Sequence, residues 1–183
     1  VSTAILAGAT TVCYDGQFYF DTDHSEGASG TQSNDISVDI STLPGAGDDN
    51  TPSAPNLTQM QLSIFAAVKQ ILSFKDDRGE PMNENASRFL VMVPTGLYDK
   101  ALHATATMAN GALPQNFQPN LLSRFGIDVA MNVRLNAWTD KFVVFRTDSP
   151  IKGLIRQTEQ EVELKAKAEG SEFEFDNDAW QFG

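Results

Sequence analysis

The chain has 183 residues, 41% of them hydrophobic, which is enough for one domain with a real apolar core, with or without extended arms. Its formal net charge of −11 at pH 7 argues against a protein whose main task is to grip nucleic acid, because phosphate binding requires clustered Lys and Arg. So acidic a surface would repel DNA, although solubility explains the charge equally well.

The sequence shows no sign of a membrane span or a signal peptide, and it has one cysteine. No run of about 18 apolar residues exists, and the apolar start at residues 1–11 lacks the basic flank of a signal peptide. We therefore expect no membrane span and, by default, an intracellular location. The single cysteine, Cys13, excludes an internal disulfide. We interpret it as a small buried apolar group, because neither histidine lies in a recognisable catalytic context to activate it.

The first local motif is VCYDGQFYF at residues 12–20. It predicts a β-hairpin, because Asp15 and Gly16 favour a tight turn between aromatic and β-branched flanks. Residues 21–56 are then rich in Gly, Ser, Asp, Thr and Pro, and one short strand is expected where Ile36, Val38 and Ile40 alternate with polar residues. Connectors of this length usually serve a function or reach a neighbour.

Two helices are predicted next. The stronger covers residues 57–74 after an N-cap at Asn56, and Lys69 and Lys75 near its end suit the helix dipole. A strand at residues 89–93 then feeds a second helix, which begins near Pro94 and stops at Asn110 and Gly111. The first helix has one apolar stripe at three- and four-residue steps, with Phe65 beside it: Leu57, Met60, Ile64, Val68, Ile71 and Leu72.

The rest of the chain is predicted to be mainly strands, at residues 127–135, 141–147, 151–155, 161–168 and 172–175. In the last two, apolar and charged side chains alternate, so that one face is apolar and the other wet. They hold too few large apolar side chains to close a core and should need a partner. The predicted class is α+β, with a long and a shorter helix against mostly antiparallel strands.

One short stretch could bear metal chemistry. Asp21, Asp23 and His24 are close in sequence, and Asp oxygens with a His nitrogen can converge from a loop on a hard metal or zinc. The set is incomplete, and we favour a loop-closing cluster that hydrogen-bonds its own backbone.

Other candidate residues favour structural roles. The acidic residues at 76–84 follow a helix end and indicate a solvated turn more than paired catalytic carboxylates: Asp76, Asp77, Glu80 and Glu84. His103 is expected to be partly buried on the second helix. Trp138 and Trp180 are expected anchors, for a strand start in the core and for an intersubunit contact. No catalytic, cofactor-binding or metal-binding residue is assigned.

Several segments in order are similar to one known family. They are CYDGQFYFDTDH at residues 13–24, the amphipathic helix, GEP at 79–81, FLVMVP at 89–94 with the helix of Leu97 and Ala101, Ala137 with Trp138, and SEFEFD at 171–176. This order and spacing, over nearly all the chain, resembles the Mu-like phage major head subunit, the gpT family. Each motif alone occurs widely.

The resemblance implies a fold. It is the Hong Kong 97-type capsid fold of tailed phages, with a long spine helix, a peripheral-domain β-sheet and an axial domain. Residues 1–56 would form an extended-loop or arm-like hairpin and polar connector, residues 57–88 the spine helix and turn, residues 89–135 an axial-domain-like region, and residues 136–183 peripheral strands and the C-terminal segment. Full family members carry a substantial region before the hairpin, so we expect this chain to be a piece of a larger subunit.

The resemblance also implies a role. The chain would be a structural head protein, not an enzyme, and would need no cofactor. Its copies would form pentamers and hexamers and, from these, the icosahedral shell of the virion, which would be assembled in the bacterial cytoplasm. Scaffold or protease and portal proteins would be partners, DNA would be packaged without specific binding, and no membrane is involved. Expected subunit-contact residues are Tyr14, Phe18, Phe20, Phe173, Phe175 and Trp180.

Two other functions stay open at the level of sequence. An encapsulin-like nanocompartment shell shares the fold and encloses cargo enzymes in place of a genome. A small metal-dependent hydrolase would use Asp21, Asp23 and His24.

Overall fold

The computed structural model describes residues 2–43, 50–105 and 121–150, together with residues 154, 166–167, 176 and 181–182. The chain divides into two compact units, Val1–Gly153 and Leu154–Gly183. The first unit combines helices with a three-stranded sheet, in agreement with the predicted α+β class. Across the described residues, no helix is long and apolar enough to cross a membrane.

Helix α2 (Leu57–Leu72) begins where the sequence predicts and ends slightly earlier, at Leu72 instead of Phe74. The Asn56 side chain accepts a hydrogen bond from the Gln59 N–H at 2.9 Å, and the Gln59 side chain accepts one from the Asn56 N–H at 2.8 Å. This capping box satisfies backbone donors that a helix start otherwise leaves free.

The sheet has strand order β2-β1-β3, with β1 (Arg88–Val93) in the centre. Strand β2 (Gly126–Met131) runs parallel to β1, whereas β3 (Val143–Arg146) runs antiparallel to it. The expectation of mostly antiparallel strands is therefore wrong for this sheet, which is mixed. A parallel neighbour requires a crossover connection, and the chain between β1 and β2 includes helix α3 (Tyr98–Thr105).

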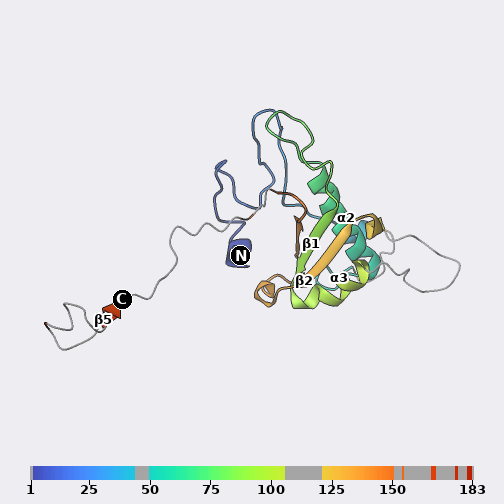
Figure 1. The fold of residues 1–183 in the computed structure, drawn as a ribbon. Coiled ribbons are helices and arrows are strands. Elements are labelled where there is room, and N and C mark those ends of the chain that lie inside the picture. Colours follow the sequence, from blue (N-terminus) through green and yellow to red (C-terminus); the bar gives the residue numbers. More distant parts are fainter. Residues whose placement is uncertain are drawn as a thin grey trace. The chain divides into compact units, whose positions relative to one another are not determined.

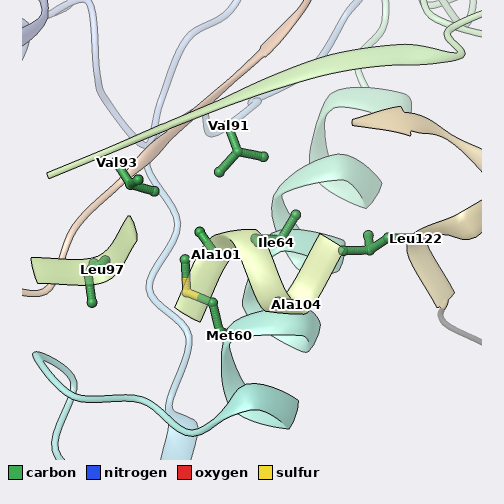
Figure 2. Packing of buried hydrophobic residues seen from close by; sticks show 8 residues of the cluster. All are labelled: Met60, Ile64, Val91, Val93, Leu97, Ala101, Ala104 and Leu122. Atoms are coloured by element: carbon green, nitrogen blue, oxygen red, sulfur yellow. The ribbon is translucent and has the colours of Figure 1, made fainter. Parts of the chain in front are cut away.

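The core lies where β1, α2 and α3 meet (Figure 1). Figure 2 shows Val91 and Val93 of β1 facing the side of α3 that carries Ala101, with side chains of α2 close by. The small alanines let α3 approach both neighbours, and each large aliphatic side chain buried here contributes about 1.5–3 kcal/mol. The full cluster is Met60, Ile64, Val91, Val93, Leu97, Ala101, Ala104 and Leu122.

The second predicted helix is present as a short 3-10 turn, η2 (Thr95–Leu97), followed by α3. Its predicted end at Asn110 and Gly111 lies outside the described residues. His103 is exposed, so the expectation of a partly buried histidine is wrong. It lies between Ala101 and Ala104 in sequence but off the face that these alanines bury.

Before α2, two short helical segments replace predicted irregular or extended structure. Helix α1 (Ser2–Leu6) buries Ile5 and was not anticipated from the sequence. The strand expected at Ile36, Val38 and Ile40 does not form; instead Ile40 opens the 3-10 helix η1 (Ile40–Thr42). Asp39 is its N-cap and accepts a hydrogen bond from the Ser41 N–H at 3.0 Å, which favours a turn over extended backbone.

A buried glutamine joins this region to the core helix. Gln59 is fully buried, and its Nε2 donates to the Ile40 carbonyl at 3.1 Å and to Asn50 Oδ1 at 2.9 Å. Its Oε1 accepts the hydrogen bond from the Asn56 N–H in the capping box, so both ends of the side-chain amide are hydrogen-bonded. A buried amide is tolerated because it is satisfied in this way.

A polar network closes one corner of the sheet. Asp148, just after β3, accepts hydrogen bonds from Arg146 Nε at 2.6 Å and from the Ser87 N–H at 2.7 Å. Arg146 also donates to Asn83 Oδ1 at 2.8 Å, and Asn83 donates to the Ile71 carbonyl at 2.6 Å. The Arg146 hydrogen bond, followed by that from Ser87, holds the pKa of Asp148 far below its usual range.

In the second unit, β4 (Ala166–Lys167) pairs antiparallel with β5 (Gln181–Phe182). The described part of the strand predicted at residues 161–168 is thus a strand. The strand predicted at residues 172–175 lies outside the described residues, as does that at 151–155 except for Leu154, which is in a bend, and so do the contact candidates Phe173, Phe175 and Trp180.

Candidate subunit-contact surface

The predicted hairpin turn forms, although one bridge replaces extended strands. Val12 and Phe18 are antiparallel bridge partners, and the Cys13 N–H donates to the Gln17 carbonyl at 2.7 Å. Gly16 has φ of 85°, a left-handed conformation that glycine adopts without steric cost. We call residues 12–18 the N-terminal hairpin.

The N-terminal hairpin exposes large apolar side chains. Tyr14 at its tip is 91% exposed, Val12 is 59% exposed and Phe18 is 41% exposed. Val12 and Phe18 form a bridge pair, and side chains of such a pair lie on the same face, so two apolar groups share one side of the hairpin. Exposed apolar groups gathered on one short element are typical of a contact surface.

Phe20, the third predicted contact residue of this region, differs from the other two. It is half-buried, and its ring packs edge-to-face with the Tyr19 ring, at a centroid distance of 4.9 Å, and with the Trp138 ring, at 6.4 Å. A Cβ at Gly8 would come within 2.4 Å of the Phe20 ring, so the glycine leaves room for it. Phe20 thus connects the hairpin to the chain around Trp138, which is half-buried as well.

The structure does not bring Asp21, Asp23 and His24 together as a metal site. Within the part of the chain that is described, no group of three or more His, Cys, Asp or Glu side chains is placed to hold a metal ion. Asp21 instead accepts hydrogen bonds from the Thr22 N–H at 2.7 Å and the Phe18 N–H at 3.2 Å, and these lower its pKa. The prediction of a cluster that bonds its own backbone is confirmed.

His24 pairs with a carboxylate of the hairpin. Its Nδ1 lies 2.6 Å from Asp15 Oδ2, and this hydrogen bond is the main reason why the pKa of Asp15 is lowered. Its Nε2 is buried and has no hydrogen-bond partner among the described residues. The pair fastens the turn of the hairpin to the loop that follows it.

That loop is held in turn by the segment after α2, and Figure 1 shows the two running side by side. The Gln32 amide donates to the Lys75 carbonyl at 3.0 Å and accepts from the Lys75 N–H at 2.6 Å. The Ala28 N–H donates to the Asp77 carbonyl at 2.6 Å. A Cβ at Gly27 would meet the same Asp77 oxygen at 2.4 Å, so only glycine permits this approach.

The acidic residues after α2 hold a turn. Asp76 accepts hydrogen bonds from the Arg78 N–H and the Glu80 N–H, each at 2.9 Å. Asp77, Glu80 and Glu84 are exposed. The interpretation as a solvated turn is confirmed.

Cys13 is half-buried, not fully buried as expected. Burial, and secondarily the charge of Asp15, raises the pKa of its thiol. A raised thiol pKa is opposite to the shift that activates a nucleophilic cysteine.

A second exposed apolar pair lies at the end of β2. Met131 is 49% exposed and Val133, the first residue of the 3-10 helix η4 (Val133–Leu135), is 62% exposed. The intervening Asn132 donates to Ser2 Oγ of α1 at 3.0 Å, so the N-terminal helix adjoins this site. We call Met131 and Val133 the η4 knob.

Comparison with known proteins bears on the same part of the chain. The family model of the Mu-like prophage major head subunit gpT matches residues 1–43. The matched residues include α1, the N-terminal hairpin and η1. No curated protein and no solved structure matches the chain. The match supports the resemblance seen in the sequence, and it suggests a phage capsid protein, with a structural more than an enzymatic role.

The sequence analysis named Tyr14 and Phe18, which the structure exposes, but it did not name the residues of the η4 knob. Residues 127–135 were predicted as one strand, in which alternate residues would face a core. The strand ends at Met131 instead, and Leu135 alone of η4 is buried. The signal that could have located the change is Asn132, which accepts a hydrogen bond from the Arg134 N–H at 3.1 Å as an N-cap.

Proposed function

We propose that this chain is a structural major head protein of a Mu-like phage or prophage, with the Hong Kong 97-type capsid fold. Copies assemble through repeated head-to-tail contacts into pentamers and hexamers, and these close an icosahedral shell around DNA. The single observation that carries the proposal is the match of residues 1–43 to the gpT head-subunit family.

Two features of the described residues support a contact role for the matched part. Tyr14 and Phe18 remain exposed on a hairpin whose own turn is fixed by Asp15, Gly16 and His24. A rigid element that presents aromatic side chains loses little conformational entropy when it binds. Phe20 contributes by fixing the hairpin to Trp138.

The regional assignment extends the same proposal. Helix α2 is the spine helix, residues 89–135 supply the axial-domain-like region, and residues 136–183 supply peripheral strands. Strand β3 pairs with β1, so the described sheet joins strands from both of these last regions. Phe173, Phe175 and Trp180 complete the proposed contacts. Scaffold or protease and portal proteins act in assembly, and the virion is the final location.

Sedimentation velocity and negative-stain microscopy of the purified chain, over a range of concentration, test the proposal. We expect association into rings or shells, and we expect Tyr14→Asp to weaken it by about tenfold or more, as for a central aromatic contact. Leu102→Asp is the control, because Leu102 is another exposed apolar residue and lies on α3. A chain that stays monomeric at every concentration contradicts the proposal.

Metal analysis of the same sample separates the remaining functions. A stoichiometric bound ion that is lost in Asp21→Asn and His24→Ala variants would support the hydrolase instead. Shells that enclose a protein cargo and no DNA would support the nanocompartment.

A further inference from the structure

Charge is segregated along the chain in a way that bears on how copies meet. Every Lys and Arg lies at or beyond Lys69, so the N-terminal hairpin and the loop after it contain no lysine or arginine. Between residues 12 and 32 the acidic residues are Asp15, Asp21, Asp23 and Glu26. Asp15 is paired with His24, whereas Asp23 and Glu26 are exposed. The apolar hairpin therefore has an acidic border.

The η4 knob has a mainly basic border. Arg134 follows Val133 directly, Lys141 lies shortly before β3, and both are exposed. Neither forms an ion pair with another residue of the described part of the chain. The acidic residue of this border is Asp140. Apolar Met131 and Val133 are thus accompanied by two cations that have no ion-pair partner within the described residues.

The two surfaces belong to one frame but do not cover each other. The Phe20 and Trp138 rings and the hydrogen bond from Asn132 to Ser2 connect the N-terminal segment to the chain around η4. Tyr14 and Val133 nevertheless remain 91% and 62% exposed. Two different uncovered surfaces of opposite charge on one chain suit a heterologous contact, which closes rings when repeated.

We infer that the N-terminal hairpin of one copy docks on the η4 knob of a second copy of this chain. Val12, Tyr14 and Phe18 contact Met131 and Val133 in the centre, while Arg134 and Lys141 face Asp21, Asp23 and Glu26 at the rim. An apolar centre with a charged rim is the usual composition of a protein interface. This inference rests on the proposed self-assembly and names the surface that receives the hairpin.

Disulfide trapping between two variants tests the contact directly. Both chains carry Cys13→Ser; one adds Tyr14→Cys and the other Val133→Cys, and the two are mixed and oxidised. We expect mixed disulfide dimers to exceed same-variant dimers by about tenfold, because docking raises the local thiol concentration. The pair Val12→Cys with Met131→Cys provides a second spacing, since a disulfide forms only over short Cα distances.

Leu102→Cys in place of Val133→Cys is the control, because Leu102 is exposed and lies on α3. Equal trapping of Leu102→Cys, or dominance of same-variant dimers with both spacings, overturns the inference.

Charge reversal gives an independent result. Arg134→Glu should weaken self-association about fivefold, and adding Asp23→Lys to the same chain should restore it. If neither variant changes self-association, the η4 knob is not the docking surface, while the proposed function still stands. A wild-type chain that never associates would contradict both the docking inference and the proposed function.

Discussion

The sheet with its two helices and the N-terminal segment before α2 are stabilised by different forces. In the first, Phe89, Val91 and Val93 of one strand are fully buried against helices. In the second, Ile5 and Ile40 are the buried large apolar side chains of the described residues up to Thr42. Hydrogen bonds to Gln32, Gln59 and Asp21 fix most of its course.

The difference shows that conformation and exposed apolar surface can be separated. A segment ordered by hydrogen bonds does not have to bury its large side chains, so Tyr14 and Phe18 stay available on a defined frame. The sheet, in contrast, uses its apolar residues internally, and this part should determine whether the chain folds.

The largest effect is expected for Ile64→Asp. Ile64 is 0% exposed in the core, and an unpaired buried carboxylate should abolish cooperative unfolding. The milder Ile64→Ala should cost about 2–5 kcal/mol. Phe65, which lies beside the predicted apolar stripe, is only half-buried, so Phe65→Asp should be less severe. Thermal unfolding by circular dichroism measures all three, and a normal midpoint for Ile64→Asp would contradict the assigned core.

Gln59→Leu tests how strongly the N-terminal segment is held to the core. It removes the hydrogen bonds that the Gln59 side chain makes with the Ile40 carbonyl, with Asn50 and with the Asn56 N–H, and each lost bond costs about 0.5–1.5 kcal/mol. Urea unfolding should show the loss. The control Thr58→Ala, an exposed position of the same helix, should change stability by no more than about 0.5 kcal/mol.

Gly27→Ala and Gly30→Ala form a matched pair within the N-terminal segment. Both glycines have positive φ, 52° and 70°, but only at Gly27 would a Cβ collide with Asp77. Gly30→Ala should cost about 1 kcal/mol from backbone strain alone, and Gly27→Ala more. Equal midpoints in urea unfolding would show that the two loops do not depend on this approach.

The smallest effect is a difference in acid sensitivity. Hydrogen bonds lower the pKa values of Asp21 and Asp39 below 3.8, and that of Asp148 is lowered much further. Groups with lowered folded pKa values stabilise the fold above about pH 4 and lose this contribution as the pH falls. The N-terminal segment should therefore loosen before the sheet corner does.

Amide chemical shifts followed by NMR from pH 5 to acid can check this order. The Thr22 and Ser41 amides, which donate to Asp21 and Asp39, should titrate at a higher pH than the Ser87 amide, which donates to Asp148. Earlier titration of Ser87 would reverse the ranking of the two regions.

Local signals in the sequence predicted the elements whose causes are local. Helix α2 follows from Asn56 and the apolar stripe, and the hairpin turn from Asp15 and Gly16. Pairing between distant strands was not predictable in this way. Strand β2 lies parallel to β1 across a connection that includes α3, and hydrophobic alternation does not encode strand direction. The strand expected at Ile40 does not form, because Asp39 caps a 3-10 helix there and Gln59, a polar residue of the predicted amphipathic helix, donates to the Ile40 carbonyl.

The same distinction applies to the candidate contact surface. Tyr14 and Phe18 are aromatic residues of the predicted hairpin and could be proposed from the sequence. Met131 and Val133 resemble ordinary strand residues, and only the end of β2 exposes them. Asp21 and His24 were candidates for a shared metal ion. In the structure Asp21 accepts a hydrogen bond from the Thr22 N–H, whereas His24 pairs with Asp15.

The junction at Gln32 depends on the chemical identity of one side-chain amide. Its amide uses one end as donor and the other as acceptor toward the same residue, Lys75. Deamidation to glutamate would remove the donor and place a carboxylate against the Lys75 carbonyl. A change at one side chain would thus weaken the attachment of the hairpin's loop to the segment after α2, where the hydrogen bond from Ala28 to Asp77 would remain.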